Sequence, residues 1–378
     1  MKKAYRQMVS VIVPLYYGKK YVGQILKQIE KNNAYACDIE IQLVFYNDCP
    51  DENIKIDHAK YNFEIEVINA DRNAGIHGAR VNALRQAAGE YILFLDQDDV
   101  IRDNYIQSQC QKIGDADAVV CRLINGKRLH YTDSFRFEEV ITKEFMLKNW
   151  CPIVSPGQVL LRKEAVSDIW KENILKNNGA DDYFLWLCMM AEEKRLALNQ
   201  EVLFEHVITG YNTSENTNLM MDSEEEMIRI LEREAVFCER DQTMFDVLRP
   251  SLRHIHVKQL DTQRNALNCL NRLYVDLLKK GYICDWMKKH RDKRIAIYGA
   301  GELGTGLYDF LKSQGLNTVC YLDQNAKFIM SEIPVYTLKE ADIKLDSILL
   351  TIPSTSLYEN LRCKFNCEVV DVRSVCWE

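Results

Sequence analysis

Residues 91–99 read Tyr-Ile-Leu-Phe-Leu-Asp-Gln-Asp-Asp, an apolar run that ends in a cluster of acids. The run is rich in residues that favour β-structure, so it predicts a buried strand over Tyr91–Leu95. Side chains two apart along a strand point to the same side, so Asp96 and Asp98 are expected to offer carboxylates to one cation. Mg²⁺ and Mn²⁺ prefer oxygen ligands and often share them with substrate phosphates.

A purely structural explanation exists for the same acids. Asp99 or Asp103 would cap the next helix, because aspartate is one of the preferred residues at a helix N-cap. The residues of this stretch alone leave both interpretations open.

The alternation of strand and helix patterns extends on both sides of this run. Strands alternating with helices are typical of a mostly parallel sheet with helices on both faces. Residues 1–215 are therefore predicted to form one α/β domain. Its further strands are expected at Val9–Leu15, Ile41–Tyr46 and Glu64–Ile68, and helices at Val22–Lys31 and Ala79–Ala88.

Residues 216–291 differ in composition from the first domain. No glycine lies between Gly210 and Gly281, which predicts a helical connector. Ser223 followed by Glu226 predicts a capping box at a helix start, and Gly281 fits a helix C-terminus. Such a helical segment could also serve a homodimer contact.

Residues 292–378 predict a small Rossmann-like α/β domain. A strand at Arg294–Tyr298 is followed by Gly299-Ala300-Gly301-Glu302-Leu303-Gly304 and an amphipathic helix. Gly299, Gly301 and Gly304 would let a nucleotide or dinucleotide approach the helix N-terminus, and Asp323 would hold a ribose hydroxyl. S-adenosylmethionine and nucleotide-sugar domains share this pattern, and a structural or docking role is equally open. The domain's further strands are expected at 318–322, 347–352 and 368–372.

The composition is that of an ordinary soluble protein. The 378 residues are 47% hydrophobic and 27% charged, with a formal charge of −7, which gives no electrostatic reason to expect nucleic acid as a partner. No apolar run approaches the length of a membrane span, and the first residues lack the apolar stretch of a signal peptide. The 13 cysteines are scattered, which favours free thiols in a reducing cytoplasm. Peripheral association with the inner face of the membrane stays compatible with this picture.

Several segments, in one order, resemble the inverting family-2 glycosyltransferases. Val9–Tyr16 resembles their first strand, and Leu43–Asp48 their second strand with its nucleotide-reading aspartate. Asn73-Ala74-Gly75 followed by Ala79-Arg80-Val81-Asn82 resembles the segment ahead of the metal motif. Asp181–Trp186 resembles the acidic pair and Leu-Trp that carry the catalytic base.

The resemblance implies a GT-A fold and the transfer of a sugar from a nucleotide-sugar donor, in particular a UDP-sugar. The acceptor would be a hydroxyl of a glycan or a lipid-linked glycan, and one base would suffice because a diphosphate bound to a cation leaves easily. The implied roles are nucleotide binding for Pro14, Tyr16, Asp48, Arg80 and Asp96, Mn²⁺ or Mg²⁺ binding for Asp96, Asp98 and His206, proton abstraction for Asp182, and support of the acceptor for Asp181.

Some residues depart from the family pattern. Cys49-Pro50-Asp51-Glu52 replaces its usual Gly-Ser-Thr-Asp turn, Tyr17 replaces a common polar residue, and Thr209 stands where many members carry a metal-binding histidine. His206, three residues earlier, is the substitute candidate. His77 and Arg72 are expected near the diphosphate, and Trp150 with Ser155–Gln158 near the acceptor.

Two other functions remain open from the sequence. One is an NAD-dependent oxidoreductase acting on nucleotide sugars through the Gly299 loop. The other is a non-catalytic nucleotide-sugar-binding scaffold, against which the intact Asp96, Asp98 and Asp182 argue.

Overall fold

The computed structural model describes residues 7–36, 38–132, 135–209, 212–280, 282–351 and 355–372. Gly210, Gly281 and Ile352 lie outside them, so the expectations on these residues are not addressed. The chain forms two compact units, Met1–Gly126 with His130–Val257 and Lys127–Leu129 with Lys258–Glu378. These units group the residues differently from the three predicted domains, whose boundaries stay a prediction.

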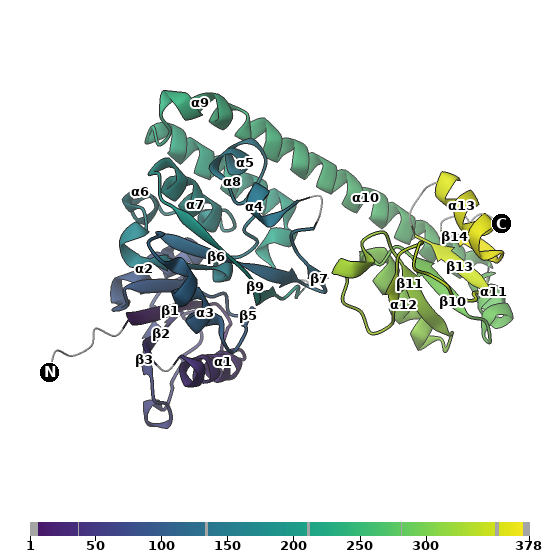
Figure 1. Cartoon of the computed structure of the whole chain (residues 1–378), viewed down its shortest axis with the longest axis horizontal. Helices are drawn as coiled ribbons and strands as arrows, with labels where there is room; N and C mark the ends of the chain where they lie inside the picture. Colours follow the sequence, from purple (N-terminus) through teal and green to yellow (C-terminus); the bar gives the residue numbers. More distant parts are fainter. Residues whose placement is uncertain are drawn as a thin grey trace. The chain divides into compact units, whose positions relative to one another are not determined.

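The first unit begins with the alternating strands and helices that the sequence predicts (Figure 1). Its strands are β1 Gln7–Leu15, β2 Ile39–Asn47, β3 Glu64–Asn69, β4 Tyr91–Phe94, β5 Val100–Ile101, β6 Ala118–Asn125, β8 Val159–Arg162 and β9 Leu196–His206, and β7 is Arg128–Leu129. Its helices are α1 Val22–Tyr35, α2 Gly75–Gln86, α3 Tyr105–Ile113, α4 Phe137–Val140, α5 Lys143–Lys148, α6 Asp168–Glu172, α7 Asp181–Ala191, α8 Thr217–Arg233 and α9 Glu239–Asp246.

The strands of the first unit form one mixed sheet in the order β3-β2-β1-β4-β8-β6-β9-β5. β1 to β4 pair in parallel, and their nearly continuous buried runs suit strands covered on both faces. β8 is antiparallel to β4 and β6, and β5 is antiparallel to β9. Most strands of this path therefore share one direction, as expected, and β8 and β5 are the exceptions, because strand direction depends on pairing that periodicity does not report.

The topology brings several chain segments to one edge of this sheet. β6 and β9 run parallel to each other, and both are antiparallel in sense to β8, as is β4. The carboxyl ends of β1, β2, β4, β6 and β9 therefore share an edge with the start of β8. In open α/β sheets, ligands bind beyond the carboxyl ends of the strands.

Helices α8 and α9 pack with the first unit. The capping box predicted at Ser223 is wrong, because α8 begins earlier and Asn216 caps it by accepting a hydrogen bond from the Leu219 amide. Ser223 lies inside the helix, where its hydroxyl accepts from the Ala180 amide and donates to the Asn177 carbonyl. The side chain thereby holds the loop before α7.

The second unit contains an all-parallel sheet in the order β12-β11-β10-β13-β14. The order reverses at β10, as in doubly wound folds, and this confirms a second, small α/β domain. Its elements are β10 Ile295–Tyr298, β11 Thr318–Leu322, β12 Val335–Tyr336, β13 Ser347–Leu350, β14 Glu368–Asp371, α11 Tyr282–His290, α12 Glu302–Ser313 and α13 Thr355–Phe365, and α10 Leu248–Lys280 precedes them.

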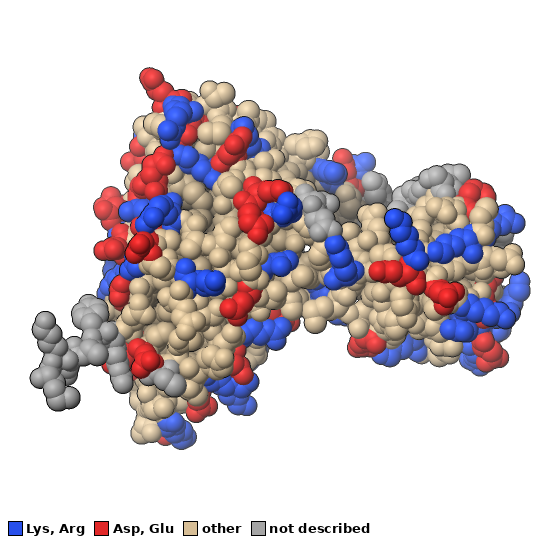
Figure 2. Space-filling model, viewed as in Figure 1, with Lys and Arg blue, Asp and Glu red and all other residues tan. Residues whose placement is uncertain are grey.

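Short 3₁₀ turns complete the chain, at His58–Lys60, Pro156–Gln158, Lys163–Ala165, Thr213–Glu215 and Ala326–Phe328. Within the described ranges, no helix has the length and apolarity needed to cross a membrane. Basic and acidic side chains are interspersed over the face of the protein shown in Figure 2. Free thiols occur at Cys49, Cys110, Cys121, Cys151, Cys188, Cys238, Cys320, Cys363 and Cys367.

Candidate functional site

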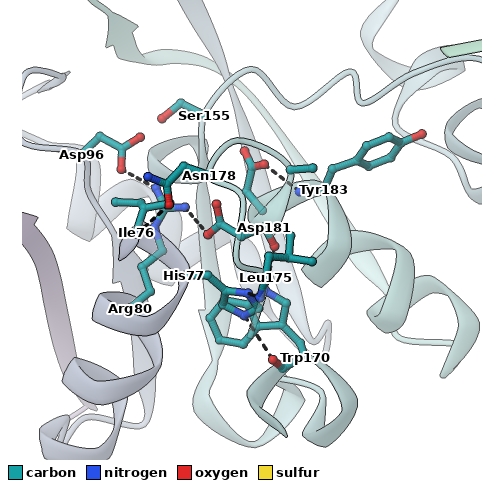
Figure 3. A network of polar contacts seen from close by, with 12 residues as sticks. Ile76, His77, Arg80, Asp96, Ser155, Trp170, Leu175, Asn178, Asp181 and Tyr183 are labelled. Atoms are coloured by element: carbon teal, nitrogen blue, oxygen red, sulfur yellow. Dashed lines mark hydrogen bonds and ion pairs between the residues drawn. The ribbon is translucent and has the colours of Figure 1, made fainter. Parts of the chain in front are cut away.

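Arg80 joins two of the predicted site segments at the carboxyl edge of the first sheet (Figure 3). Its side chain is 5% exposed, and Nη1 donates to Asp181 Oδ2 over 2.5 Å. Nη2 donates to Asp96 Oδ1. The neighbouring acids outweigh burial and raise the pKa of Arg80, so the guanidinium stays charged. The metal motif after β4 and the acidic pair of α7 therefore form one cluster.

The acidic pair begins α7, as the sequence predicts. Asp181 is buried, and its backbone carbonyl accepts a hydrogen bond from Trp170 Nε1 over 2.7 Å. Acids in the first turn suit the helix dipole. The Ser223 hydroxyl holds the preceding Ala180 amide, so the start of this helix is fixed from two sides.

Asp182 is half-buried and differs from its neighbour. Its Oδ1 accepts a hydrogen bond from the Tyr183 amide over 2.7 Å. Burial and the charge of Asp181 raise the pKa of Asp182 to about 7, although Arg80 acts in the opposite direction. A carboxylate with a pKa near neutrality is suited to accept a proton at physiological pH.

Asp96 and Asp98 lie in a turn rather than on a strand, because β4 ends at Phe94. The strand-alternation argument for their common direction was therefore wrong. Burial and the charges of Asp99 and Asp96 raise the pKa of Asp98 to about 6. Burial also raises the pKa of Asp96, against the effect of Arg80. Acids that raise each other's pKa gain free energy when a cation binds between them.

The donor set fits a cation that also binds phosphate. Within the described part of the chain, no three His, Cys, Asp or Glu side chains converge as a complete metal site. Mg²⁺ and Mn²⁺ are commonly held by one or two carboxylates together with substrate phosphates, so a complete protein set is not required.

Asp99 is the site residue that the sequence argument missed. It is 0% exposed, and it is not the cap of α3, whose N-cap is Asn104. Its Oδ1 accepts from the Val207 amide and from His206 Nδ1 over 3.0 and 2.9 Å, and its Oδ2 accepts from the Ser155 hydroxyl over 2.8 Å. The capping interpretation is therefore wrong, for Asp103 as well, whose carboxylate pairs with Lys31 on the surface.

His206 ends β9 and faces this buried carboxylate. Burial opposes a positive charge on its ring, but the hydrogen bond with Asp99 and the charges of nearby acids raise its pKa. A metal-binding histidine is usually oriented by a carboxylate on its other ring nitrogen, which is the role Asp99 could take.

The residues predicted to bind the nucleotide lie at the ends of β1 and β2. Asp48 is buried, its Oδ1 accepts from the Ala74 amide over 2.7 Å, and burial raises its pKa. Tyr16 is 50% exposed, and its backbone exchanges hydrogen bonds with the Gln97 side chain. Pro14 is buried in β1 opposite Tyr46. Gln97 thus ties the end of β1 to the metal motif.

The sequence suggested that His77 lies near the diphosphate, but the structure buries its ring away from solvent. It is 1% exposed, its Nε2 lies 3.1 Å from the Trp170 carbonyl, and its Nδ1 accepts from the Leu175 amide over 3.0 Å. Burial lowers the pKa of His77, so the ring is neutral and structural. Arg72, by contrast, is exposed.

The turn Ser155–Gln158, expected near the acceptor, is buried. Gln158 donates to the Cys121 carbonyl and to the Tyr131 hydroxyl, and it accepts from the Val154 amide. Trp150 is half-buried against the rings of Phe145 and Phe135. The turn therefore builds the core of the site region rather than its surface.

The Gly299 loop of the second unit follows β10. Gly299 has a φ of +96°, and a Cβ on Gly304 would lie 1.8 Å from the Gly299 carbonyl oxygen. Asp323 accepts from the Ala300 and Asn325 amides, one with each carboxylate oxygen. These contacts explain Gly299, Gly304 and Asp323 within the fold itself, and the predicted nucleotide or dinucleotide site stays a prediction.

Residues 10–170 match the family model of glycosyl transferase family 2. This segment covers β1 to β8, and therefore the metal motif and Arg80. The matched segment therefore resembles a family-2 glycosyltransferase domain. The predicted GT-A class of the first domain is thereby confirmed.

Curated relatives resemble the same domain. The poly(ribitol-phosphate) beta-N-acetylglucosaminyltransferase TarS of Staphylococcus aureus is 30% identical over 125 residues, which are 31% of this chain and 22% of TarS. The UDP-Glc:alpha-D-GlcNAc-diphosphoundecaprenol beta-1,3-glucosyltransferase WfgD of Escherichia coli is 25% identical over 51% of this chain and 73% of WfgD. The chain spans half or less of the length of the first curated relatives it matches, at 49% and 22%.

Solved structures of glycosyltransferases align with part of this chain. S. aureus TarS 1–349 in complex with UDP-GlcNAc aligns with a TM-score of 0.44 and 16% identity over 60% of this chain and 66% of TarS 1–349. The mannosyltransferase PcManGT from Pyrobaculum calidifontis, in complex with GDP-Man and Mn²⁺, aligns with a TM-score of 0.46 and 13% identity over 70% of this chain and 81% of PcManGT.

Proposed function

We propose that the first unit transfers a sugar from a UDP-sugar to a hydroxyl of a glycan or lipid-linked glycan, with inversion at the anomeric carbon. The observation that carries the proposal is the cluster in which Arg80 joins Asp96 of the metal motif to the acidic pair of α7. A proposed donor-binding group and the acid next to the candidate base are thereby held by one buried side chain.

Asp182 is the base in this proposal. Its carboxylate takes the proton of the acceptor hydroxyl while the oxygen attacks the anomeric carbon. The bond to the nucleoside diphosphate breaks on the opposite side, which inverts the configuration. A pKa near 7 lets Asp182 be ionised before the reaction and hold the proton afterwards.

Asp96, Asp98 and His206 are proposed to hold Mn²⁺ or Mg²⁺, with the donor phosphates as further ligands. The ion would neutralise the charge that develops on the departing diphosphate. Asp99 would orient His206 through the hydrogen bond to Nδ1. Asp48, Tyr16 and Pro14 remain the proposed contacts of the nucleotide.

The relative WfgD supports the choice of donor and acceptor, because its name specifies UDP-glucose and a diphosphoundecaprenol-linked sugar. The similarity to WfgD extends over 51% of this chain. The oxidoreductase alternative has no comparable support, since the positive φ of Gly299 and the close approach at Gly304 account for these two loop glycines without a ligand.

Thermal unfolding of the full chain with UDP, with and without Mn²⁺, tests the proposal. A ligand at 100 times its dissociation constant stabilises by about 2.7 kcal/mol, which gives a clear rise in Tm. We expect this rise to require Mn²⁺ and to disappear in Asp98→Asn. Asp103→Asn is the matched control, because Asp103 is a surface acid near the same turn that pairs with Lys31. A rise in Tm with UDP that depends neither on Mn²⁺ nor on Asp98 would contradict the proposal.

A further inference from the structure

Arg80 is a second cation that already competes for the proposed metal ligand Asp96. The guanidinium is almost fully buried, and the charges that face it are Asp96, Asp181 and, less directly, Asp182. Its Nε is buried, and within the described residues it has no hydrogen-bond acceptor. The position of the guanidinium is therefore decided mainly by its contacts with Asp96 and Asp181.

Arg80 pairs with Asp96 on the proposed donor side and with Asp181 next to the proposed base. Asp181 is 3% exposed and Asp96 27% exposed on their side chains, so Asp181 is the more deeply buried partner. Hydrogen bonds between charged groups at a buried position are stronger than those at the surface. If Asp181 lost its charge, Arg80 would be held more strongly by Asp96.

We propose that Asp181 is a positioning residue that acts through Arg80: it draws the guanidinium away from Asp96 and so keeps Asp96 available to the metal–nucleotide complex. Coupling between two sites through a shared group is reciprocal for binding free energies. Occupation of Asp96 by a cation therefore strengthens the contact of Arg80 with Asp181 and fixes the start of α7, where the base Asp182 lies. The inference rests on the proposed function, because it takes Asp96 as a ligand of the metal–nucleotide complex.

The proposal assigns Asp181 a different task from Asp182, although the two acids are adjacent. Arg80 donates its hydrogen bonds to Asp181 and Asp96, whereas Asp182 accepts one from the Tyr183 amide. Removal of the Asp182 charge would therefore leave the hydrogen bonds of Arg80 to Asp96 and Asp181 intact. A comparison of the two variants therefore separates the proposed effect of Asp181 through Arg80 from a general loss of negative charge near the cation.

The test measures Mn²⁺ binding in the presence of saturating UDP by thermal shift, without turnover. Asp181→Asn keeps an oxygen to accept from Arg80 but removes the charge, and we expect it to raise the Mn²⁺ concentration at half-effect by about tenfold. Asp182→Asn should change it by less than about threefold. Asp241→Asn is the matched stability control, because Asp241 is a buried acid that pairs with Lys143 elsewhere in the unit.

A double-mutant cycle keeps the proposal falsifiable if one variant is unstable. In Arg80→Lys, the single ammonium group cannot replace the two-pronged contact of the guanidinium with Asp96 and Asp181. In that background, the further change Asp181→Asn should have less than about a threefold effect on Mn²⁺ binding. Equal effects of Asp181→Asn and Asp182→Asn, or an additive cycle, would overturn the inference. Absence of Mn²⁺-dependent UDP binding in the wild type would instead overturn the proposed function, and the inference with it.

Discussion

At the scale of single residues, Asp181 and Asp182 show how environment separates two identical side chains. Asp181 is buried and bound by Arg80, so its carboxylate is committed to an ion pair. Asp182 accepts a hydrogen bond from the Tyr183 amide, and its pKa is raised to about 7. The adjacent acids are therefore suited to different tasks, one holding structure and one moving a proton.

Asp182→Asn is expected to lower kcat by about 10²–10⁴-fold, because general-base catalysis is lost. Binding of UDP with Mn²⁺ should persist, since Asp182 is not a proposed ligand. Steady-state kinetics and thermal shift on the same preparation give both values. A variant that transfers sugar at the wild-type rate would remove Asp182 from the mechanism.

The pH dependence follows from the raised pKa of Asp182. The base must be ionised, so kcat/KM should rise with pH through about 7 and level off above it. For stability the sign is opposite: the folded state binds the proton more tightly than the unfolded chain between about pH 4 and 7, so Asp182 lowers stability as pH rises through that window. Asp182→Asn should therefore raise the Tm at pH 8 relative to wild type and leave it nearly unchanged at pH 4. A Tm difference that does not depend on pH would contradict this assignment.

At the scale of elements, the decisive contacts in both units lie where helices start and strands end. The start of α7 is fixed by Trp170 and Ser223, and the turn after β4 is fixed by Asp99 and Gln97. In the second unit, α12 starts so close to the end of β10 that only glycine fits at position 304. Close packing of backbone on backbone is therefore the local requirement there.

Gly304→Ala should destabilise the second unit by about 1–3 kcal/mol or more, because the new Cβ would overlap the Gly299 carbonyl oxygen. Gly306→Ala, two residues along the same helix, meets nothing within 4 Å and should stabilise by about 1 kcal/mol. Urea unfolding of both variants measures the difference. Equal effects of the two substitutions would show that the close approach at Gly304 is not maintained in solution.

At the scale of the whole molecule, the chain has separate hydrophobic cores. One cluster fills the first unit and includes Trp170 and Trp186, while the second unit packs two clusters on the faces of its own sheet. Trp286 belongs to the second unit, where its ring stacks on His290. Units with their own cores can unfold independently.

Calorimetry of the full chain should show two transitions, and UDP with Mn²⁺ should raise only the Tm of the first unit. Gly304→Ala should lower only the other transition. This variant therefore identifies which peak belongs to which unit. If UDP with Mn²⁺ raised only the Tm of the transition that Gly304→Ala lowers, the nucleotide site would have to lie in the second unit.

The local patterns of the sequence were sufficient for the first strands and for the motifs that follow them. Apolar runs and helical periodicity depend on neighbouring residues only, so β1 to β4, α1 and α2 could be predicted together with the acids after β4 and at the start of α7. The order of these motifs also indicated the family that the comparison then identified.

Tertiary structure alone decided which distant residues meet. The Arg80–Asp181 pair joins positions 101 residues apart, and the Asp99–His206 pair joins positions 107 apart. The Asp99–His206 pair exists because β9 runs in the same direction as β4 and so ends at the same edge of the sheet, and strand direction cannot be read from periodicity. The burial of His77 likewise depends on distant residues, Trp170 and Leu175. The sequence alone therefore determined the local elements and the types of group available for chemistry, while long-range packing determined their partners, their burial and hence their charge.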